Sequence, residues 1–376
     1  MKFVHLSDLH LGKRVNGFSL LEDQRYILRQ ILEIVEREAP DGVLVAGDVY
    51  DKSVPSAEAV GLLDEFLTAL AELGLQVFLI SGNHDSPERL AFGGRLMGRS
   101  GVHVTPVYAG TAEPVELRDE HGPVRVYLLP FLRPSVVRRF HEGEAESWTE
   151  ALRLAVEAMD IDPDLRNVLV AHQFVTGAER SESEEVSVGG ADNVDAAVFA
   201  AFDYVALGHI HRPQNVGGGN IRYCGTPLKY AFSEAGQEKS VTVAELGKKG
   251  ELAVRTVPLR PLRDMRELRG SYEELTARSF YQGTDYPDSY LHITLTDEED
   301  VPEALGRLRT VYPWLMRLDY DNARTRSGGA ALEAAEEKPP LELFAQLYAR
   351  QNGQPMTDRQ QQLVEKLIAK IWEGEA

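Results

Sequence analysis

Five short apolar runs alternate with segments of helical periodicity over roughly the first 260 residues. The runs are rich in Val, Leu and Ile, and they lie at residues 2–8, 41–51, 76–85, 167–174 and 204–212. Between the early runs, residues 20–38 and 57–74 repeat apolar residues every three to four positions, as amphipathic helices do. This alternation predicts an α/β fold with mostly buried sheets.

The pattern changes after residue 262, where a proline- and arginine-rich stretch precedes a smaller set of elements. Residues 290–296, 300–312 and 314–320 read as a strand, a helix and a strand, enough for a small α/β domain. We therefore expect one domain at 1–262, a second at 263–325, a flexible linker at 326–340 and a helical segment at 341–376.

The last segment, 341–376, reads as two short amphipathic helices. Thr357 is a candidate N-cap, and an apolar face follows it, formed by Leu363, Leu367, Ile368 and Ile371. So short a pair of helices cannot bury this face by itself. We expect it either to pack on the rest of the chain or to dock on a partner helix.

Charge and cysteine content narrow the function classes. The 376 residues carry a formal net charge of −19, which argues against binding nucleic acid through bulk charge but permits a local basic patch. No apolar run reaches about 18 residues, so we expect no transmembrane helix. The apolar N-terminal run ends too early for a signal peptide. The single cysteine, Cys224, fits a reducing cytoplasm and reads as a small core residue rather than a catalytic thiol.

Polar side chains end each of the five apolar runs. They are Asp8, His10, Asp48, Asp51, Asn83, His84, Asp85, His172, His209 and His211. Taken singly, each has an ordinary explanation, such as a turn residue or a hydrogen-bonded core histidine. Ligands in open α/β sheets collect beyond the carboxyl ends of strands. Five such ends in succession therefore favour a metal site.

The residue types suggest which metal. Carboxylate, amide and imidazole ligands without a thiolate suit Mn²⁺, Fe or Zn²⁺ better than Ca²⁺. This many ligands around one ion would leave no room for a substrate, whereas two ions about 3.5–4 Å apart would form a clamp for a phosphoryl group. Such a pair needs a bridging carboxylate, and Asp48 is central in the order of candidates.

A family resemblance follows from these motifs. The series DLHLG, GDVYD, GNHD, His172 and GHIH resembles the calcineurin-type metallophosphoesterase signature. The flanking segments YVALGHIHR, RYCGTP and PFLRP resemble, more narrowly, the SbcD family of bacterial nuclease subunits. The resemblance implies a four-layer α/β/β/α sandwich with a small α/β capping domain and a C-terminal helical pair.

The resemblance also implies residue roles. The first metal would be held by Asp8, His10, Asp48 and His211. The second would be held by Asp48, Asn83, His172 and His209. His84 would not be a ligand but would protonate or stabilise the leaving oxygen. Asp51 either orients His84 or serves as a helix N-cap or loop carboxylate.

The implied reaction is phosphodiester hydrolysis with water as nucleophile and no covalent enzyme intermediate. The arginine that follows the second aspartate in protein phosphatases is absent from GDVYDKS, which weakens a phosphoprotein interpretation. Basic residues near the motifs form either a track for a DNA backbone or ordinary solvated surface: Lys13, Arg14, Arg89, Arg95, Arg99, Arg133, Arg138, Arg139 and Arg212.

By resemblance, the activities would be a 3′ to 5′ exonuclease on double-stranded DNA and an endonuclease on single strands or hairpins. Mn²⁺ would be the metal, and the roles would lie in DNA repair, recombination and replication. The helices at 341–376 would dock on the SbcC ATPase, the segment 263–325 would cap the site, and helices near 53–100 would form a homodimer. Two alternatives remain: a small-molecule phosphodiesterase or phosphatase, and a non-catalytic DNA-end tether with structural metals.

Overall fold

The computed structural model describes the whole chain except residues 142–144, 182, 184–191, 324–339, 353 and 373–376. The chain forms two compact units. The first comprises Met1–Glu267, Asp285–His292 and Tyr312–Arg317, and the second comprises the described residues of Leu268–Thr284, Ile293–Val311 and Leu318–Ala376. The domain limits expected at 262 and 325 stay predictions.

The first unit contains a six-stranded sheet built from both ends of its sequence. Its strands, in spatial order, are β14 (Leu252–Pro258), β13 (Ser240–Leu246), β1 (Lys2–Leu6), β4 (Gly42–Ala46), β5 (Gln76–Ile80) and β6 (Val102–Val104). β1, β4, β5 and β6 pair in parallel, whereas β13 and β14 are antiparallel. The three expected N-terminal runs therefore lie side by side with their carboxyl ends at one edge.

A second six-stranded sheet is formed by the middle of the chain. Its order is β11 (Gln214–Asn215), β12 (Ile221–Tyr223), β10 (Tyr204–Gly208), β9 (Arg166–His172), β8 (Gly122–Leu129) and β7 (Val115–Asp119). The central strands from β12 to β8 are parallel, and antiparallel strands close both edges. A separate small hairpin joins β2 (Arg14–Val15) and β3 (Phe18–Ser19).

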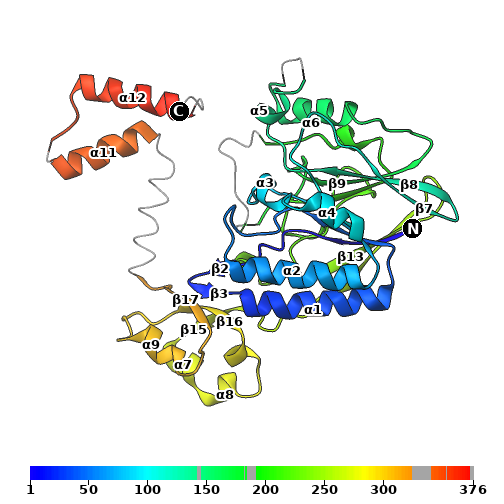
Figure 1. The fold of residues 1–376 in the computed structure, drawn as a ribbon. Coiled ribbons are helices and arrows are strands. Elements are labelled where there is room, and N and C mark those ends of the chain that lie inside the picture. The colour runs from blue at the N-terminus through cyan, green and yellow to red at the C-terminus, as the bar shows by residue number, and fades with distance from the viewer. Residues whose placement is uncertain (142–144, 182, 184–191, 324–339, 353, 373–376) are drawn as a thin grey trace. The chain divides into compact units, whose positions relative to one another are not determined.

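In the first unit, α1 and α2 lie on one outer side and α5 and α6 on the opposite side, with the short α3 and α4 between them (Figure 1). Their bounds are α1 (Leu21–Glu38), α2 (Ala57–Glu72), α3 (Pro87–Leu90), α4 (Gly94–Met97), α5 (Pro134–Val137) and α6 (Trp148–Glu157), with 3-10 turns η1 (Gly98–Ser100), η3 (Ala196–Phe199), η4 (Phe232–Glu234) and η5 (Tyr286–Asp288). Ser56 and Ser147 cap α2 and α6 by accepting a main-chain N–H. No helix in the described part of the chain combines the length and the apolar character that crossing a membrane requires.

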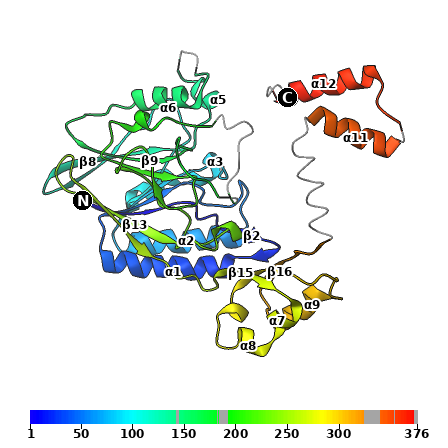
Figure 2. The same cartoon turned by 180° about the vertical axis from the view of Figure 1, so that it is seen from behind.

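Three buried clusters account for the layering. One packs α1 and α2 on the first sheet, and another packs α6 and η3 on the second. The third lies between the sheets and includes Phe3, Phe78, Val126, Val170 and Tyr204. The first unit is thus the expected α/β/β/α sandwich, and Figure 2 shows the same layers from behind.

The loops at the carboxyl ends of the parallel strands have an unusual backbone. Seven non-glycine residues of the described chain have a positive φ, and four of them lie in these loops: Asp8 (52°), His10 (44°), Asp48 (45°) and His209 (96°). Such conformations cost on the order of 1–3 kcal/mol each and persist only where surrounding contacts enforce them. They cluster at functional sites, so this edge of the two sheets is where the chemistry is expected.

The second unit contains parts of a three-stranded sheet with short helices. The strands are β15 (Met265–Gly270), β16 (Tyr290–Leu295) and β17 (Leu315–Tyr320), in that order, and the helices are α7 (Tyr272–Thr276), α8 (Arg278–Tyr281) and α9 (Ala304–Arg309). The strands and helix expected over 290–320 are confirmed, whereas β15, α7 and α8 were not anticipated. Leu275, Ile293, Leu295 and Leu308 are fully buried and form the core of this unit.

Two helices end the described chain, α11 (Pro340–Asn352) and α12 (Asp358–Trp372). The expected N-cap is confirmed: Thr357 Oγ1 accepts the Gln360 N–H at 3.4 Å, and Gln360 Oε1 accepts the Thr357 N–H at 2.9 Å. This reciprocal pair is a capping box. The expected linker at 326–340 lies outside the described residues except for Pro340, where α11 begins.

Candidate metal centre

The loop after β1 carries Asp8 and His10 and is held from two directions. The Asp8 and His10 N–H groups donate to the carbonyls of Gly47 (3.0 Å) and Asp48 (2.9 Å) in the loop after β4. From the other side, Gln24 Nε2 of α1 donates to the His10 carbonyl at 2.7 Å, and the Tyr230 hydroxyl donates to the Leu9 carbonyl at 2.5 Å. These contacts enforce the left-handed backbone at Asp8 and His10 and fix the direction of their side chains.

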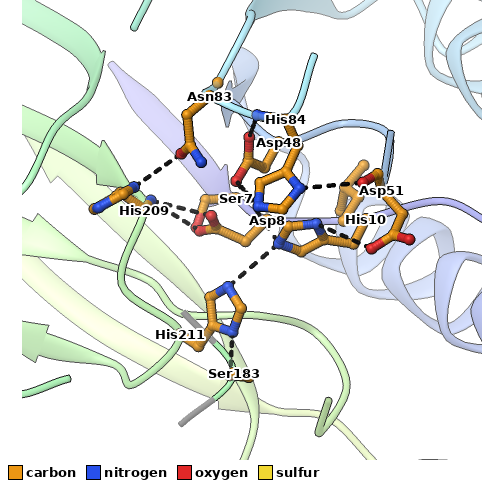
Figure 3. A network of polar contacts seen from close by, with 12 residues as sticks. Ser7, Asp8, His10, Asp48, Asp51, Asn83, His84, Ser183, His209 and His211 are labelled. Atoms are coloured by element: carbon orange, nitrogen blue, oxygen red, sulfur yellow. Dashed lines mark hydrogen bonds and ion pairs between the residues drawn. The ribbon is translucent and has the colours of Figure 1, made fainter. Parts of the chain in front are cut away.

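Asp48 lies at the centre of the cluster (Figure 3). Its Oδ1 accepts the His84 main-chain N–H at 2.9 Å, and its Oδ2 lies 3.7 Å from His10 Nε2 and 3.4 Å from His172 Nε2. Glycine is required beside it, since a Cβ on Gly82 would lie 2.2 Å from Asp48 Oδ1. The carboxylate is therefore shared between ligands from both sheets, as a bridging position requires.

Asn83 joins two histidines of the second sheet. Its Oδ1 lies 2.9 Å from His172 Nε2 and 2.9 Å from His209 Nδ1. The other ring nitrogen of His172, Nδ1, donates to the Ala46 carbonyl at 2.8 Å, which leaves Nε2 as the nitrogen that faces Asn83 and Asp48. The His209 N–H donates to Asp8 Oδ1 at 3.0 Å, so the two sheets are also joined through the main chain.

His211 faces the opposite side of the cluster from His209. Its Nε2 lies 3.2 Å from His10 Nε2, and its Nδ1 lies 2.6 Å from the Ser183 hydroxyl. The two histidines of GHIH are thus divided between different neighbours, as Figure 3 shows. The backbone turns at His209, whose φ is 96°, and this turn sends the two rings apart.

The candidate ligands form overlapping groups. In the described part of the chain, the ligand atoms within each group lie within 4.8 Å of one another: Asp8 with His10 and His211, His10 with Asp48 and His84, and Asp8 with Asp48 and His172. Asn83 and His209 adjoin His172 as described above. The structure therefore brings together all seven side chains that the sequence nominated as ligands, and it does so from five strand ends.

Burial and neighbouring charges shift the pKa values of the candidate ligands. Burial raises the pKa of the Asp8 carboxyl to about 6. Burial acts in the same direction on Asp48, yet the charges of His172 and His10 outweigh it and hold the pKa of this carboxyl well below its usual range. Burial lowers the pKa of His209 to about 3 and also lowers that of His10. At His172 burial acts in the same direction, but the Asp48 carboxylate outweighs it and raises the pKa to about 9. Metals bind the neutral imidazole, so His172 would release a proton when a cation binds.

The surroundings fit a divalent metal. Asp8 and Asp48 are both buried, and the strongest charges acting on each of them come from histidines, with Asp48 also acting on Asp8. Burying two ionised carboxylates next to each other costs free energy unless a cation neutralises them. His10 Nδ1 is buried and has no hydrogen-bond partner among the described residues. The donor set of carboxylate, amide and imidazole belongs to the Mn²⁺, Fe and Zn²⁺ class.

Comparison with known proteins also supports a phosphoesterase with a divalent metal site. The profile of the calcineurin-like phosphoesterase family matches residues 1–213, and that of the type 5 capsule protein repressor C-terminal domain matches residues 261–352. The SbcD protein of the SbcCD nuclease from Staphylococcus epidermidis is 33% identical over 383 aligned residues, covering 100% of both proteins. Its counterpart from Staphylococcus saprophyticus subsp. saprophyticus is 32% identical over 382 residues, covering 99% of each.

The chain belongs to the SbcD family of calcineurin-like phosphoesterases. Both the family and the fold expected from the motifs are thereby confirmed. Among solved structures, a dimetal phosphatase from Danio rerio matches with a TM-score of 0.41 at 14% identity, over 69% of this chain and 98% of that one.

In this member of the SbcD family, the His84 ring contacts the main chain of Asp51 and not its side chain. His84 Nδ1 lies 3.1 Å from the main-chain carbonyl oxygen of Asp51, not from its carboxylate. The Asp51 carboxylate instead accepts a hydrogen bond from Lys13 Nζ at 2.7 Å. Asp51 therefore contacts His84 through its backbone carbonyl and not through its carboxylate, and its role in orienting His84 stays a prediction.

Asp85 organises the loops of the site, a role that the sequence did not indicate. Its carboxylate accepts three main-chain N–H groups, from Val49 at 3.0 Å, Tyr50 at 2.9 Å and Gly82 at 2.9 Å. It thereby ties the loop after β4 to the loop after β5. Its position directly after His84 in GNHD is the signal that would have suggested such a role.

Cys224 and the basic residues have ordinary surroundings. Cys224 is buried, its thiol donates to Ser7 Oγ at 3.1 Å, and burial raises its pKa to about 12. The core role expected for this residue is confirmed.

Among the basic residues, Lys13 pairs with Asp51 and Arg212 with Glu179, whereas Arg89, Arg99, Arg133 and Arg139 are exposed.

Proposed function

We propose that this chain is a metal-dependent DNA nuclease that works with the ATPase SbcC. Family membership supports a phosphoesterase, and the relatives named as parts of the SbcCD nuclease support a nuclease. The observation that carries the proposal is the convergence of seven candidate ligand side chains from five strand ends, with Asp48 shared by two of their groups. Such a centre suits the hydrolysis of phosphodiesters.

The proposed centre holds two divalent ions, most favourably Mn²⁺. One would be held by Asp8, His10, Asp48 and His211, and the other by Asp48, Asn83, His172 and His209. When bound, the pair would neutralise the phosphate oxygens and lower the pKa of an attacking water. The strained loops and the hydrogen bonds to main-chain carbonyls hold these side chains ready beforehand, which reduces the reorganisation needed on binding.

His84 is the proposed proton donor to the leaving sugar oxygen. Its side chain is 20% exposed, whereas those of His10, His172 and His211 are at most 3% exposed. The main-chain carbonyl of Asp51 accepts from His84 Nδ1, and Asp48 accepts its main-chain N–H, so both ring and backbone are oriented. The Nε2 side of the ring then holds or releases the proton that the leaving oxygen takes up.

The proposed partners bind other parts of the chain. Residues 341–376 would dock on SbcC, and Phe344, Leu347, Leu363 and Leu367 expose apolar side chains there. The segment 263–325 would cap the centre and select substrates. A homodimer would form through residues 53–100, where Phe92 is 86% and Leu96 71% exposed.

Cleavage assays with several substrates test the proposal. Purified full-length protein, with and without Mn²⁺ and SbcC, should degrade linear duplex DNA from 3′ ends and nick single-stranded and hairpin DNA. A chromogenic phosphodiester turned over faster than any DNA would instead favour a small-molecule phosphodiesterase. The His84→Ser variant should bind DNA and Mn²⁺ normally but lose cleavage. DNA binding without cleavage in the wild type would support a tether.

A further inference from the structure

A buried ion pair lies behind the candidate ligand His211. Glu234 of η4 is fully buried and Lys239 is 5% exposed, and their Oε2 and Nζ atoms lie 2.6 Å apart. Lys239 Nζ also donates to the His211 carbonyl (3.0 Å), to Thr226 Oγ1 (2.8 Å) and to Gln237 Oε1 (2.8 Å). Burying two charges is costly even when they are paired, so a pair placed beside a ligand calls for a reason.

Glu234 Oε1 faces His211 Nδ1 at 3.6 Å, beyond hydrogen-bond distance, and a hydroxyl makes the closer link between them. Ser183 Oγ donates a hydrogen bond to Glu234 Oε1 and lies 2.6 Å from His211 Nδ1. Beside the Lys239 ammonium, Glu234 is ionised and can only accept hydrogen bonds. Ser181 Oγ also lies 3.0 Å from Ser183 Oγ, but a carboxylate is the stronger acceptor, so the single hydrogen of the Ser183 hydroxyl goes to Glu234. The hydroxyl oxygen must then accept from His211 Nδ1, which places the ring proton on that nitrogen.

The result is a defined tautomer of His211. With the proton on Nδ1, the neutral ring carries its lone pair on Nε2, the atom that lies 3.2 Å from His10 Nε2. This is also the side on which His10 and Asp8 form a group of possible ligands with His211. At His172 the Ala46 main-chain carbonyl likewise accepts the Nδ1 proton, at 2.8 Å, so Nε2 is again the nitrogen that faces the other candidate ligands.

We propose that Glu234, acting through Ser183, is a positioning residue that holds His211 in the Nδ1–H tautomer and so presents its Nε2 lone pair to a divalent cation. This inference rests on the proposed metal centre. It assigns to the Glu234–Lys239 pair a function in metal affinity beyond packing. Partners that orient a metal-binding histidine commonly contribute a factor of about 10–100 to affinity.

Calorimetric titration of the full-length protein with Mn²⁺ tests the affinity. In Glu234→Gln the amide can donate to Ser183, so the hydroxyl hydrogen is free to turn toward His211 Nδ1 and favour the wrong tautomer. One of the two Mn²⁺ sites should weaken by about 10–100-fold while the other is unchanged. Glu238→Gln, an exposed position nearby, is the matched control and should bind as the wild type does.

A metal-free measurement tests the tautomer directly. Nitrogen NMR of histidine-labelled protein should show His211 with a protonated Nδ1 and a bare Nε2 in the wild type and in Ser183→Thr, which keeps the hydroxyl. Ser183→Ala and Glu234→Gln should both lose that signature. Ser183 is only half-buried, so we expect its variants to fold. They therefore test the His211 tautomer even if Glu234→Gln fails to fold.

Two outcomes would overturn the relay. One is a His211 spectrum that stays the same in Ser183→Ala, and the other is wild-type affinity at both Mn²⁺ sites in a folded Glu234→Gln protein. Either result would show that the Glu234–Lys239 pair contributes to packing only and does not orient His211. A wild-type protein that binds no Mn²⁺ would refute the proposed function instead, while the metal-free spectra would still decide whether the relay sets the tautomer.

Discussion

The two sheets of the first unit contribute different chemistry to the same site. The strand ends of the first sheet supply every candidate oxygen ligand, from Asp8, Asp48 and Asn83, together with His10. The strand ends of the second sheet supply only candidate imidazole ligands, from His172, His209 and His211. Neither sheet carries a complete donor set for a metal pair. The centre therefore exists only when the sheets are packed face to face, and metal binding should report on that packing.

The sheets also differ in how their loops are strained. Three ligands of the first sheet have a left-handed backbone, whereas in the second only His209 does. The loops after β1 and β4 hold each other through main-chain hydrogen bonds, and Asp85 ties in the loop after β5. The second sheet presents His172 directly from its strand end. Most of the backbone strain therefore lies in the loops of the first sheet, and the second sheet adds the remaining candidate ligands.

Removal of the shared carboxylate should have the largest effect. Asp48→Asn keeps the size of the side chain and the acceptor for the His84 N–H but removes the charge between the two ligand groups. Since orienting partners alone contribute about 10–100-fold, loss of this ligand should weaken Mn²⁺ binding by more than about a hundredfold and abolish cleavage. Calorimetry and a nuclease assay check this, with the exposed α2 variant Asp64→Asn as control. Unchanged Mn²⁺ affinity would contradict a bridging role.

Separating the sheets should have the next largest effect. A Cβ on Gly208 would lie 1.8 Å from the Ala46 carbonyl oxygen and 2.7 Å from His172 Nδ1, so Gly208→Ala must push β10 away from β4. Overpacking of this kind costs about 1–3 kcal/mol and occasionally more, and so close a contact favours the upper end. Urea unfolding measures the loss, and Mn²⁺ titration should show weakened binding.

Gly61→Ala is the matched control for this substitution. A Cβ on Gly61 would have nothing within 4 Å, and the residue lies within α2, so alanine should stabilise the protein by about 0.5–1 kcal/mol. If both alanine variants unfold at the same urea concentration as the wild type, the close packing of the sheets at Gly208 is not what supports the centre.

Loosening only the first sheet's loops should have a smaller effect. Asp85→Asn replaces one acceptor oxygen with an amide, so at least one of the three buried N–H groups loses its partner. Such a loss costs about 1–3 kcal/mol of stability. Cleavage should fall more than unfolding stability alone explains, because His84 is carried on the same loop. Stability and cleavage both equal to wild type would show that Asp85 does not organise the loops.

The opposite ends of the strands provide the weakest test. Asp119 of β7 accepts hydrogen bonds from Arg166, the first residue of β9, and from the Met1 amino group before β1, so it also joins the sheets. The hydrogen bond from Arg166 holds the pKa of Asp119 well below its usual range. Its contribution to stability is therefore present above the unfolded pKa of about 3.9 and lost as the pH falls through the lower folded value.

Asp119→Asn should accordingly lower stability modestly at neutral pH, with the difference from wild type vanishing in strong acid. Mn²⁺ affinity at neutral pH should be unchanged, since the site lies at the other ends of the strands. Urea unfolding at several pH values checks the first point. A large loss of Mn²⁺ binding would mean that the two ends of the sandwich are coupled, and the comparison between the sheets would need revision.

Much of the site was predictable because it follows from strand periodicity. A short apolar run that ends in Asp, Asn or His places that side chain at the carboxyl edge of a parallel sheet, whatever the loop does next. The five runs therefore nominated the candidate ligands, and the family motif suggested how two ions would divide them. The glycines of GD, GN and GH belong to the same local information, because a side chain there would collide with Asp48 or His172.

What the sequence alone determined is the five strands that carry the site, the residues that end them and the family they define. The tertiary structure decided which atom of each residue is used: the backbone of Asp51 rather than its carboxylate, the three N–H groups on Asp85, and the Glu234–Ser183 link to His211. Periodicity specifies the face on which a side chain lies, over a few residues. Most of these contacts join residues 28 or more positions apart, so they depend on how the loops and sheets pack, and no local pattern encodes that geometry.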